Sequence, residues 1–208
     1  MIGMRSPWRR GLWAGALLVM ASAVGGQAQV NTLLSGPALI AALRAGGHVI
    51  VMRHASSPRQ PPDTPNADNV TRERQLDEAG RSSATALGEA LRRLTIPIGD
   101  VLTSPTYRAR ETVRFAQLPN AKPVEELGDG GQSMQGAAEK QGAWLRQKVA
   151  TLPRGTNAIL VTHMPNIAQA FPELADVADG EALVFGSDGK GGGRLVARVR
   201  IEEWPKLR

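Results

Sequence analysis

Short apolar runs alternate with longer amphipathic stretches along most of the chain. Residues 48–52 and 157–162 are runs rich in valine and isoleucine, as is typical of strands buried on both faces of a sheet. Between them, residues 76–94 place leucine and alanine at helical spacing and polar side chains elsewhere, which predicts an amphipathic helix. This alternation of buried strands and amphipathic helices predicts an α/β fold.

The remaining elements follow the same alternation. Residues 100–103 predict a third strand, and residues 105–116 and 133–152 predict two more helices. Residues 182–185 and 195–201 predict a closing pair of strands. Together the elements predict a three-layer α/β/α sandwich with a mostly parallel central sheet.

Two stretches without apolar periodicity are predicted to be loops. Residues 56–74 are rich in proline, aspartate, asparagine and arginine, and loops of that length in compact domains are often functional. Residues 186–193 (GSDGKGGG) are followed by no Lys-Ser or Lys-Thr pair, so the sequence favours a hairpin turn over a phosphate cradle.

The N-terminus has the layout of a secretory signal peptide. Residues 1–10 carry three arginines and no acidic residue, and residues 11–24 form an uncharged apolar run. That run is shorter than the roughly 20 residues that cross a bilayer, so we expect no stable membrane insertion. Small residues permit cleavage after Ala23 or Ala28, and we favour Ala28, which leaves residues 29–208 as the mature domain. The sequence therefore predicts a periplasmic or secreted protein.

Charge and composition exclude several classes of protein. The formal charge of +6 would fall to +3 once the three N-terminal arginines are removed. Basic residues are spread along the chain and aromatic residues make up only 4% of it, so we expect no nucleic-acid partner. The chain has no cysteine, which excludes disulfides, thiolate metal sites and a cysteine nucleophile.

Two of the three histidines directly follow the buried runs. Arg53 and His54 come directly after the first run, and His163 comes directly after the second. Because the carboxyl ends of parallel strands meet at one edge of a sheet, where ligands bind, we expect these side chains to lie close together. His48, at the start of its strand, is interpreted as a structural residue.

Helix starts and arginines are predicted to gather at the same edge. Ser104 suits a helix cap and Pro105 the first helical position, which places Arg108 on the first turn. Pro165 is expected to open another helix just after His163. Helix N-termini and arginines together attract an anion, most simply a phosphate. They would repel a zinc ion, so we expect no metal or other cofactor.

These residues resemble the histidine phosphatase superfamily (branch 1), which includes phosphoglycerate mutases and small phosphohistidine phosphatases. The run Arg-His-Ala at residues 53–55 is similar to the family's Arg-His-Gly/Ala signature. Residues 75–81 resemble its Leu-Thr-x-x-Gly helix, and residues 103–112 resemble its Ser-Ser-Pro-Leu-x-Arg-Ala-x-x-Thr motif. The resemblance covers residues 33 to about 201 and implies a phosphoglycerate mutase-like fold.

The resemblance implies a role for each matching residue. His54 matches the nucleophile that carries the phosphoryl group as a phosphohistidine, and Arg53 and Arg108 match phosphate-binding arginines. His163 matches the second histidine, which would stabilise the phosphoryl oxygens as an imidazolium or a donor tautomer. The residue types suit this chemistry, because a neutral imidazole attacks phosphorus and nearby arginines disfavour its protonation.

Two carboxylates are candidates for the proton donor to the leaving group. The family's Leu-x-acid pattern favours Asp129, with Glu126 as the alternative. A phosphoamidate substrate needs less help with its leaving group, so the absence of such an acid would favour that substrate class. Residues 56–58 lack the Glu-Thr run of the mutases, which disfavours a mutase.

Three further residues are candidates for contacting substrate. Arg74, together with Arg72, would bind a second anionic group from the 56–74 loop. Asn166 stands where the family often has a glycine-rich run, and it would either contact substrate or cap a helix.

We therefore expect an exported, metal-independent histidine acid-type phosphatase that hydrolyses a phosphomonoester through phospho-His54. Export favours a small phosphorylated substrate such as an envelope sugar phosphate. The alternatives are a phosphohistidine or phosphoprotein phosphatase, and a non-catalytic phosphate-binding member of the same fold. The sequence leaves the oligomeric state open.

Overall fold

A six-stranded mixed sheet forms the centre of the fold in the computed structural model, which describes residues 33–58, 74–129 and 137–208. The strands lie in the order β3-β2-β4-β1-β5-β6. The predicted signal peptide, the sequence around Arg72 and most of the predicted 56–74 loop lie outside the described residues.

Most neighbouring strands in the sheet run parallel. The strands are β1 (Val49–Arg53), β2 (Ile98–Thr103), β3 (Lys122–Pro123), β4 (Asn157–Thr162), β5 (Ala182–Ser187) and β6 (Gly193–Val199). Strands β3, β2, β4 and β1 are parallel, whereas β5 pairs antiparallel with β1, and β6 with β5. The predicted fold class is confirmed.

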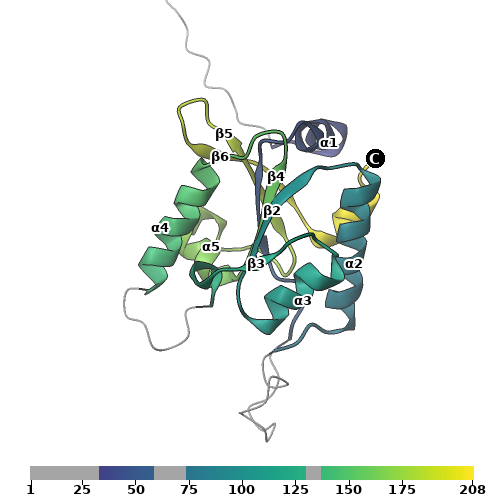
Figure 1. Cartoon of the computed structure of the whole chain (residues 1–208), viewed down its shortest axis with the longest axis vertical. Helices are drawn as coiled ribbons and strands as arrows, with labels where there is room; N and C mark the ends of the chain where they lie inside the picture. The colour runs from purple at the N-terminus through teal and green to yellow at the C-terminus, as the bar shows by residue number, and fades with distance from the viewer. Residues whose placement is uncertain (1–32, 59–73, 130–136) are drawn as a thin grey trace, which may run out of the picture. The chain divides into compact units, whose positions relative to one another are not determined.

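Helices cover both faces of the sheet (Figure 1). They are α1 (Gly36–Ala45), α2 (Glu78–Arg93), α3 (Tyr107–Phe115), α4 (Ala137–Ala150) and α5 (Met164–Ala170), with the 3-10 helices η2 (Glu125–Leu127), η3 (Pro172–Leu174) and η4 (Ile201–Lys206). Helices α2 and α3 lie on one side, α4 and α5 on the other. None of the helices within the described ranges is long and apolar enough to cross a bilayer.

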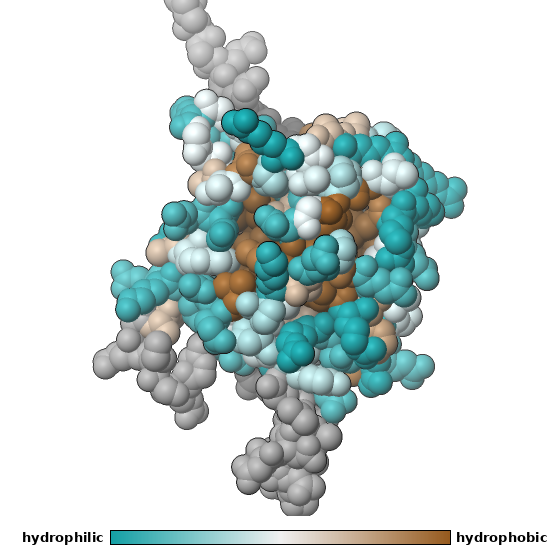
Figure 2. Space-filling model, viewed as in Figure 1, coloured by the Kyte–Doolittle hydropathy of each residue, from teal (hydrophilic) through white to brown (hydrophobic). Residues whose placement is uncertain are grey.

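Two apolar cores hold these layers together, one on each face of the sheet. One packs side chains of α1, α2, α3 and η4 against the sheet, and the other packs those of α4 and α5. All six residues of β4 are buried, as the continuous apolar run predicted. Figure 2 shows hydrophobic atoms in the middle of one face, over the region of β2, with hydrophilic atoms around them.

Several predicted boundaries differ from those observed. Strand β2 begins at Ile98 rather than at residue 100, and β6 ends at Val199 because the next residues turn into η4. Glu203 accepts a hydrogen bond from the Arg200 amide at 2.7 Å, which starts that 3-10 helix. Helix α4 ends at Ala150, before the predicted end at residue 152, and α1 and β3 were not predicted.

The parallel register brings three strand ends to one edge of the sheet. Arg53 of β1 pairs with Thr162 of β4, and Thr103 of β2 pairs with Val161. The residues that follow these ends leave the sheet side by side. This is the edge at which open α/β sheets bind ligands.

The start of α2 packs closely against the loop after β1. The Asp77 carboxylate caps the helix by accepting from the Gly80 amide at 2.6 Å, and it also accepts from the Ser56 hydroxyl at 2.8 Å. A Cβ at Gly80 would lie 2.3 Å from the Ser56 carbonyl oxygen, so the close approach requires glycine.

Candidate active site

A pocket of about 440 Å³ opens at the carboxyl ends of β1, β2 and β4. Such a volume is typical of small-molecule sites. All the predicted site residues except Asn166 line it, namely Arg53, His54, Arg74, Arg108, Asp129 and His163. The two imidazoles, each in a side chain that is 2% exposed, stand edge to face with ring centroids 5.2 Å apart.

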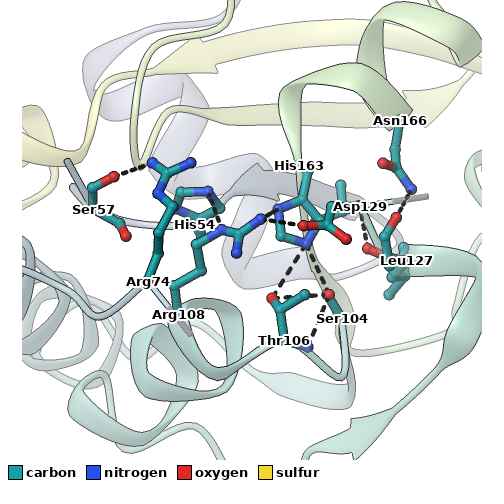
Figure 3. A network of polar contacts seen from close by, with 12 residues as sticks. His54, Ser57, Arg74, Ser104, Thr106, Arg108, Leu127, Asp129, His163 and Asn166 are labelled. Carbon is teal, nitrogen blue, oxygen red and sulfur yellow. Dashed lines mark hydrogen bonds and ion pairs between the residues drawn. The ribbon is translucent and has the colours of Figure 1, made fainter. Parts of the chain in front are cut away.

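Arg108 connects the other polar groups of the pocket (Figure 3). Its Nε donates to Nε2 of His54 at 3.1 Å, and its Nη2 donates to Nδ1 of His163 at 3.1 Å and to the Asp129 carboxylate at 2.7 Å. The side chain is buried and comes from the first turn of α3, as predicted. One guanidinium thus holds both histidines and a carboxylate in place.

The start of α3 differs from the prediction in detail. Thr106, rather than Ser104, occupies the N-cap position, and Pro105 lies before the helix. The Ser104 hydroxyl instead accepts from the Thr106 amide at 3.2 Å, which makes a tight turn between β2 and the helix. This turn leaves the Ser104 hydroxyl close to His163.

Thr112, the last residue of the matched motif, fixes α3 to the end of β1. Its hydroxyl accepts from the Ala55 amide at 3.0 Å and donates to the Arg108 carbonyl at 2.9 Å. The motif threonine therefore sets the position of Arg108 relative to the loop that carries His54.

The backbone fixes the tautomer of His54. A carbonyl oxygen can only accept, so the contact of 2.8 Å between Nδ1 and the Ala55 carbonyl places the proton on Nδ1. Nε2 consequently keeps its lone pair and accepts from Arg108. The pKa of His54 is lowered to about 4, because burial and the charge of Arg108 lower it more than the hydrogen bond to Ala55 raises it. The ring is therefore neutral at pH 7.

His163 is held by hydroxyl groups instead of a carbonyl. Arginine only donates, so Nδ1 of His163 accepts from Arg108 and the proton resides on Nε2. Nε2 lies 2.8 Å from the Ser104 hydroxyl and 3.3 Å from the Thr106 hydroxyl. Burial and then the charge of Arg108 lower the pKa of His163 to about 3. At neutral pH the free protein thus has a neutral His163, not an imidazolium.

Arg53, at the end of β1, lines the pocket with a guanidinium that is held by the segment before β5. Its Nη1 donates to the Val177 carbonyl at 2.9 Å and its Nη2 lies 2.6 Å from the Asp179 carboxylate. Its Nε is buried and has no hydrogen-bond partner in the described part of the protein. A buried guanidinium N–H without a partner is costly unless a ligand satisfies it. Arg74 also lines the pocket, and its Nη2 donates to the Ser57 carbonyl.

Of the two candidate proton donors, Asp129 lines the pocket and Glu126 does not. Glu126 is exposed on η2. Partial burial raises the pKa of Asp129, but the hydrogen bond from Arg108 and the surrounding positive charge outweigh it, so the pKa lies below its usual value. In the free protein Asp129 is an ionised partner of Arg108.

Asn166 lies behind the pocket wall rather than in it. The side chain is 3% exposed, and its amide donates to the carbonyls of Glu126 and Gly128 at 3.2 and 2.8 Å. Thr162 donates to the Leu127 carbonyl at 2.9 Å in the same segment. Neither the predicted substrate contact nor the helix cap is observed. Asn166 instead anchors the segment that leads to Asp129.

Five residues that line the pocket were not among the predicted site residues, namely Ser57, Pro58, Met164, Pro165 and Asp179. Pro165 was predicted only as a helix start. Asp179 follows no motif, but topology could have indicated it. Because β5 pairs antiparallel with β1, the residues before β5 lie beside those after β1. Within the described ranges, no cluster of His, Asp or Glu side chains has the arrangement of a metal site.

One known family matches the segment of the chain that carries most of these residues. Residues 49–129 match the sequence model of the histidine phosphatase superfamily (branch 1). This segment contains His54, both phosphate-binding candidates Arg53 and Arg108, and Asp129. The predicted resemblance to this superfamily is therefore confirmed over this segment.

Solved structures share the fold at low sequence identity. The protein histidine phosphatase SixA complexed with tungstate has 20% identity and a TM-score of 0.53, covering 75% of this chain and 98% of its own. A putative phosphohistidine phosphatase SixA from Agrobacterium tumefaciens has 17% identity and a TM-score of 0.53, with 74% and 98% covered. A mutant phosphoserine phosphatase from Entamoeba histolytica, in complex with phosphoserine, has 13% identity and a TM-score of 0.53, again with 74% and 98% covered. No curated protein sequence matches the chain.

Proposed function

We propose that the chain is a metal-independent phosphatase that hydrolyses phosphomonoesters through a phosphohistidine intermediate on His54. The observation that carries the proposal is the state of this imidazole. It is neutral, its tautomer is fixed by Ala55, and its Nε2 lone pair accepts a hydrogen bond from Arg108 in the pocket. A nucleophile and a cationic anion-binding group thus occupy one site.

The first step transfers the phosphoryl group to His54. The Nε2 lone pair forms the P–N bond while the ester P–O bond breaks, and the electron pair leaves with the alcohol oxygen. The ring becomes a phosphoimidazolium that keeps its Nδ1 proton, and the Ala55 carbonyl stabilises its positive charge. Arg108 and Arg53, which both line the pocket, bind the phosphoryl oxygens, and the Arg108 Nε–H leaves Nε2 of His54 for one of these oxygens as the P–N bond forms.

Asp129 handles the protons of both steps. The bound phosphoryl group takes up hydrogen bonds of Arg108 and adds negative charge, and both changes raise the pKa of Asp129. The carboxylate takes up a proton from water as substrate binds and then donates it to the leaving oxygen. In the second step the carboxylate takes a proton from water, the water oxygen bonds to phosphorus, and the P–N bond breaks to restore neutral His54.

One observation favours a second candidate function, dephosphorylation of phosphohistidine or another phosphoamidate on a protein. Asp129 in the free protein is an ion-paired carboxylate 2.7 Å from Arg108, a poor state for a general acid. Substrates whose leaving group needs little protonation suit such a site. An Asp129→Asn variant separates the two functions. Its kcat for an alkyl phosphate should fall by about 10²-fold or more, which is the usual contribution of general acid catalysis. Its kcat for a phosphoamidate should change little.

The proposal is tested with residues 29–208, an aryl phosphate and EDTA. Turnover with EDTA present, and an acid-labile, alkali-stable phosphoenzyme that is absent from His54→Ala, are the expected results. Phosphate binding without turnover would instead support the non-catalytic alternative. Turnover that EDTA abolishes would contradict the mechanism.

We also propose that the enzyme acts in the periplasm or outside the cell, on a small phosphorylated compound such as an envelope sugar phosphate. The support is the arrangement of residues 1–28, with three arginines followed by an apolar run and small residues at Ala23 and Ala28. Mass spectrometry of the protein from the periplasmic fraction tests this. A mature N-terminus at Gln29 is expected, and a full-length cytoplasmic protein would contradict export.

A further inference from the structure

The segment between η3 and β5 wraps around the end of β1. The Gly180 amide donates to the His54 carbonyl at 2.9 Å, and the Arg53 amide donates to the Glu181 carbonyl at 3.1 Å. The Arg53 side chain adds its two contacts to Val177 and Asp179. This segment, residues 177–181, therefore fixes both the backbone and the guanidinium next to the nucleophile.

Glu181, an ionised residue of the same segment, connects the segment to β6. Glu181 is 4% exposed, and its carboxylate accepts from Arg198 at 2.7 and 3.1 Å and from the Ala178 amide at 2.9 Å. Burial raises the pKa of Glu181, but the hydrogen bonds from Arg198 and Ala178 together lower it by more. The pKa of Glu181 therefore lies below its usual value. The segment is thus tied to β6 as well as to β1, and it forms a firm support for Asp179.

Asp179 and Val177 hold the two terminal nitrogens of Arg53. Nη1 donates to the Val177 carbonyl and Nη2 pairs with the Asp179 carboxylate, while the buried Nε has no hydrogen-bond partner among the described residues. Asp179 itself lines the pocket with a side chain that is 37% exposed. Because arginine binds phosphate oxygens through a planar set of N–H groups, its orientation decides how many of them reach the ligand.

We propose that Asp179 is a positioning residue for phosphate binding, which acts by holding the Arg53 guanidinium in place at the wall of the pocket. The proposal rests on the proposed function in that it takes a phosphoryl group as the ligand of the pocket. It assigns a negatively charged side chain a favourable role in binding an anion.

The sign of one substitution separates this role from simple electrostatics. If Asp179 acted only through its charge, Asp179→Asn would remove a negative charge beside the pocket and tighten phosphate binding. If it positions Arg53, the same substitution loosens the guanidinium and weakens binding. Asp176, three residues before Asp179, provides a matched control. It also pairs with an arginine, Arg198 at 3.0 Å, but it does not line the pocket.

The experiment titrates inorganic phosphate into the wild type, Asp179→Asn, Asp179→Glu and Asp176→Asn by calorimetry, and measures kcat and KM for an aryl phosphate. We expect Asp179→Asn to raise the phosphate Kd and the KM about tenfold, the loss of one charge-assisted contact, with a smaller change in kcat. Asp179→Glu should restore part of the affinity, and Asp176→Asn should match the wild type. Equal melting temperatures would show that the variants are folded.

A double-mutant cycle with Arg53→Ala completes the test. Once Arg53 is removed, adding Asp179→Asn should change the phosphate Kd less than twofold, because Asp179 acts only through Arg53. A change of that size is within the usual error of a double-mutant cycle. Tighter or unchanged phosphate binding in Asp179→Asn would overturn the proposal. A wild type that binds phosphate without turnover would overturn the proposed function but leave the role of Asp179 to be decided by the Kd values, and a wild type that binds no phosphate would overturn both.

Discussion

The two histidines of the pocket are alike in burial and differ in what holds their rings. Each is 2% exposed, and burial lowers the pKa of His54 to about 4 and that of His163 to about 3. His54 donates to a backbone carbonyl, which can only accept. His163 contacts the hydroxyls of Ser104 and Thr106, which can either donate or accept. In the free protein Arg108 fixes one tautomer of each ring, but the hydroxyls around His163 can also accommodate its other tautomer once Arg108 binds a ligand instead.

This difference suits two different tasks in one reaction. A nucleophile needs its lone pair at Nε2 throughout, and the carbonyl of Ala55 ensures this. The second histidine must accept from Arg108 in the free protein and donate to a phosphoryl oxygen in the complex. Ser104 donates to Thr106 at 3.1 Å, so reversing this pair of hydroxyls would let Nε2 of His163 change from donor to acceptor.

The largest expected effect is that of removing the nucleophile. His54→Ala should lower kcat for an aryl phosphate by about 10⁴-fold or more, because no phosphoenzyme can form without Nε2. The measurement is steady-state hydrolysis together with phosphoenzyme trapping. His48→Ala, a histidine outside the pocket, is the matched control and should retain full activity.

Removing the second histidine should cost less. His163→Ala is expected to lower kcat by about 10² to 10³-fold, the usual loss for one group that stabilises transition-state charge. The phosphoenzyme should still form, more slowly, in rapid-quench experiments. A loss as large as that of His54→Ala, with no phosphoenzyme, would end the distinction between the two histidines.

The hydroxyls around His163 should have a smaller effect. Ser104→Ala removes the contact of 2.8 Å to Nε2 and should reduce kcat about tenfold, as expected for one hydrogen bond to a buried group. Thr106→Val removes the longer contact of 3.3 Å and should reduce it less. If both variants kept full activity, the hydroxyls would have no part in setting the tautomer.

The smallest effects are spectroscopic. In ¹⁵N NMR, His54 should be neutral above pH 4 with its proton on Nδ1, and lowering the pH through about 4 should protonate Nε2. His163 should carry its proton on Nε2 and move it to Nδ1 when phosphate is added, whereas His54 should keep its tautomer. A tautomer change in His54, or none in His163, would contradict the comparison.

Much of the fold was predictable because buried strands leave a continuous apolar signal. The runs that became β1 and β4 are covered by helices on both faces, so nearly every position is apolar. The two-residue strand β3 carries no such signal, and its position depends on pairing with β2. Helix α1 could have been predicted, because Leu39, Ile40 and Leu43 lie on one face of it and proline stands at its start.

The site was predictable where a motif marks a strand end, and not where a contact depends on loop geometry. His54, Arg108 and His163 follow from strand ends and a helix start. Asn166 was placed in the pocket by sequence proximity to His163, but the first turn of α5 directs it to the Glu126 and Gly128 carbonyls instead. Asp179 reaches Arg53 through the antiparallel pairing of β5, which no local pattern reveals.

The ion pair between Arg108 and Asp129 has a consequence for the release of product. A phosphate that enters the pocket exchanges for a carboxylate already bound to Arg108, so its affinity reflects the difference between two ionic contacts rather than the whole of one. As inorganic phosphate departs, the Asp129 carboxylate takes its place, so the Arg108 guanidinium always has an anionic partner. The enzyme should therefore turn over in phosphate-rich surroundings with little inhibition by its own product.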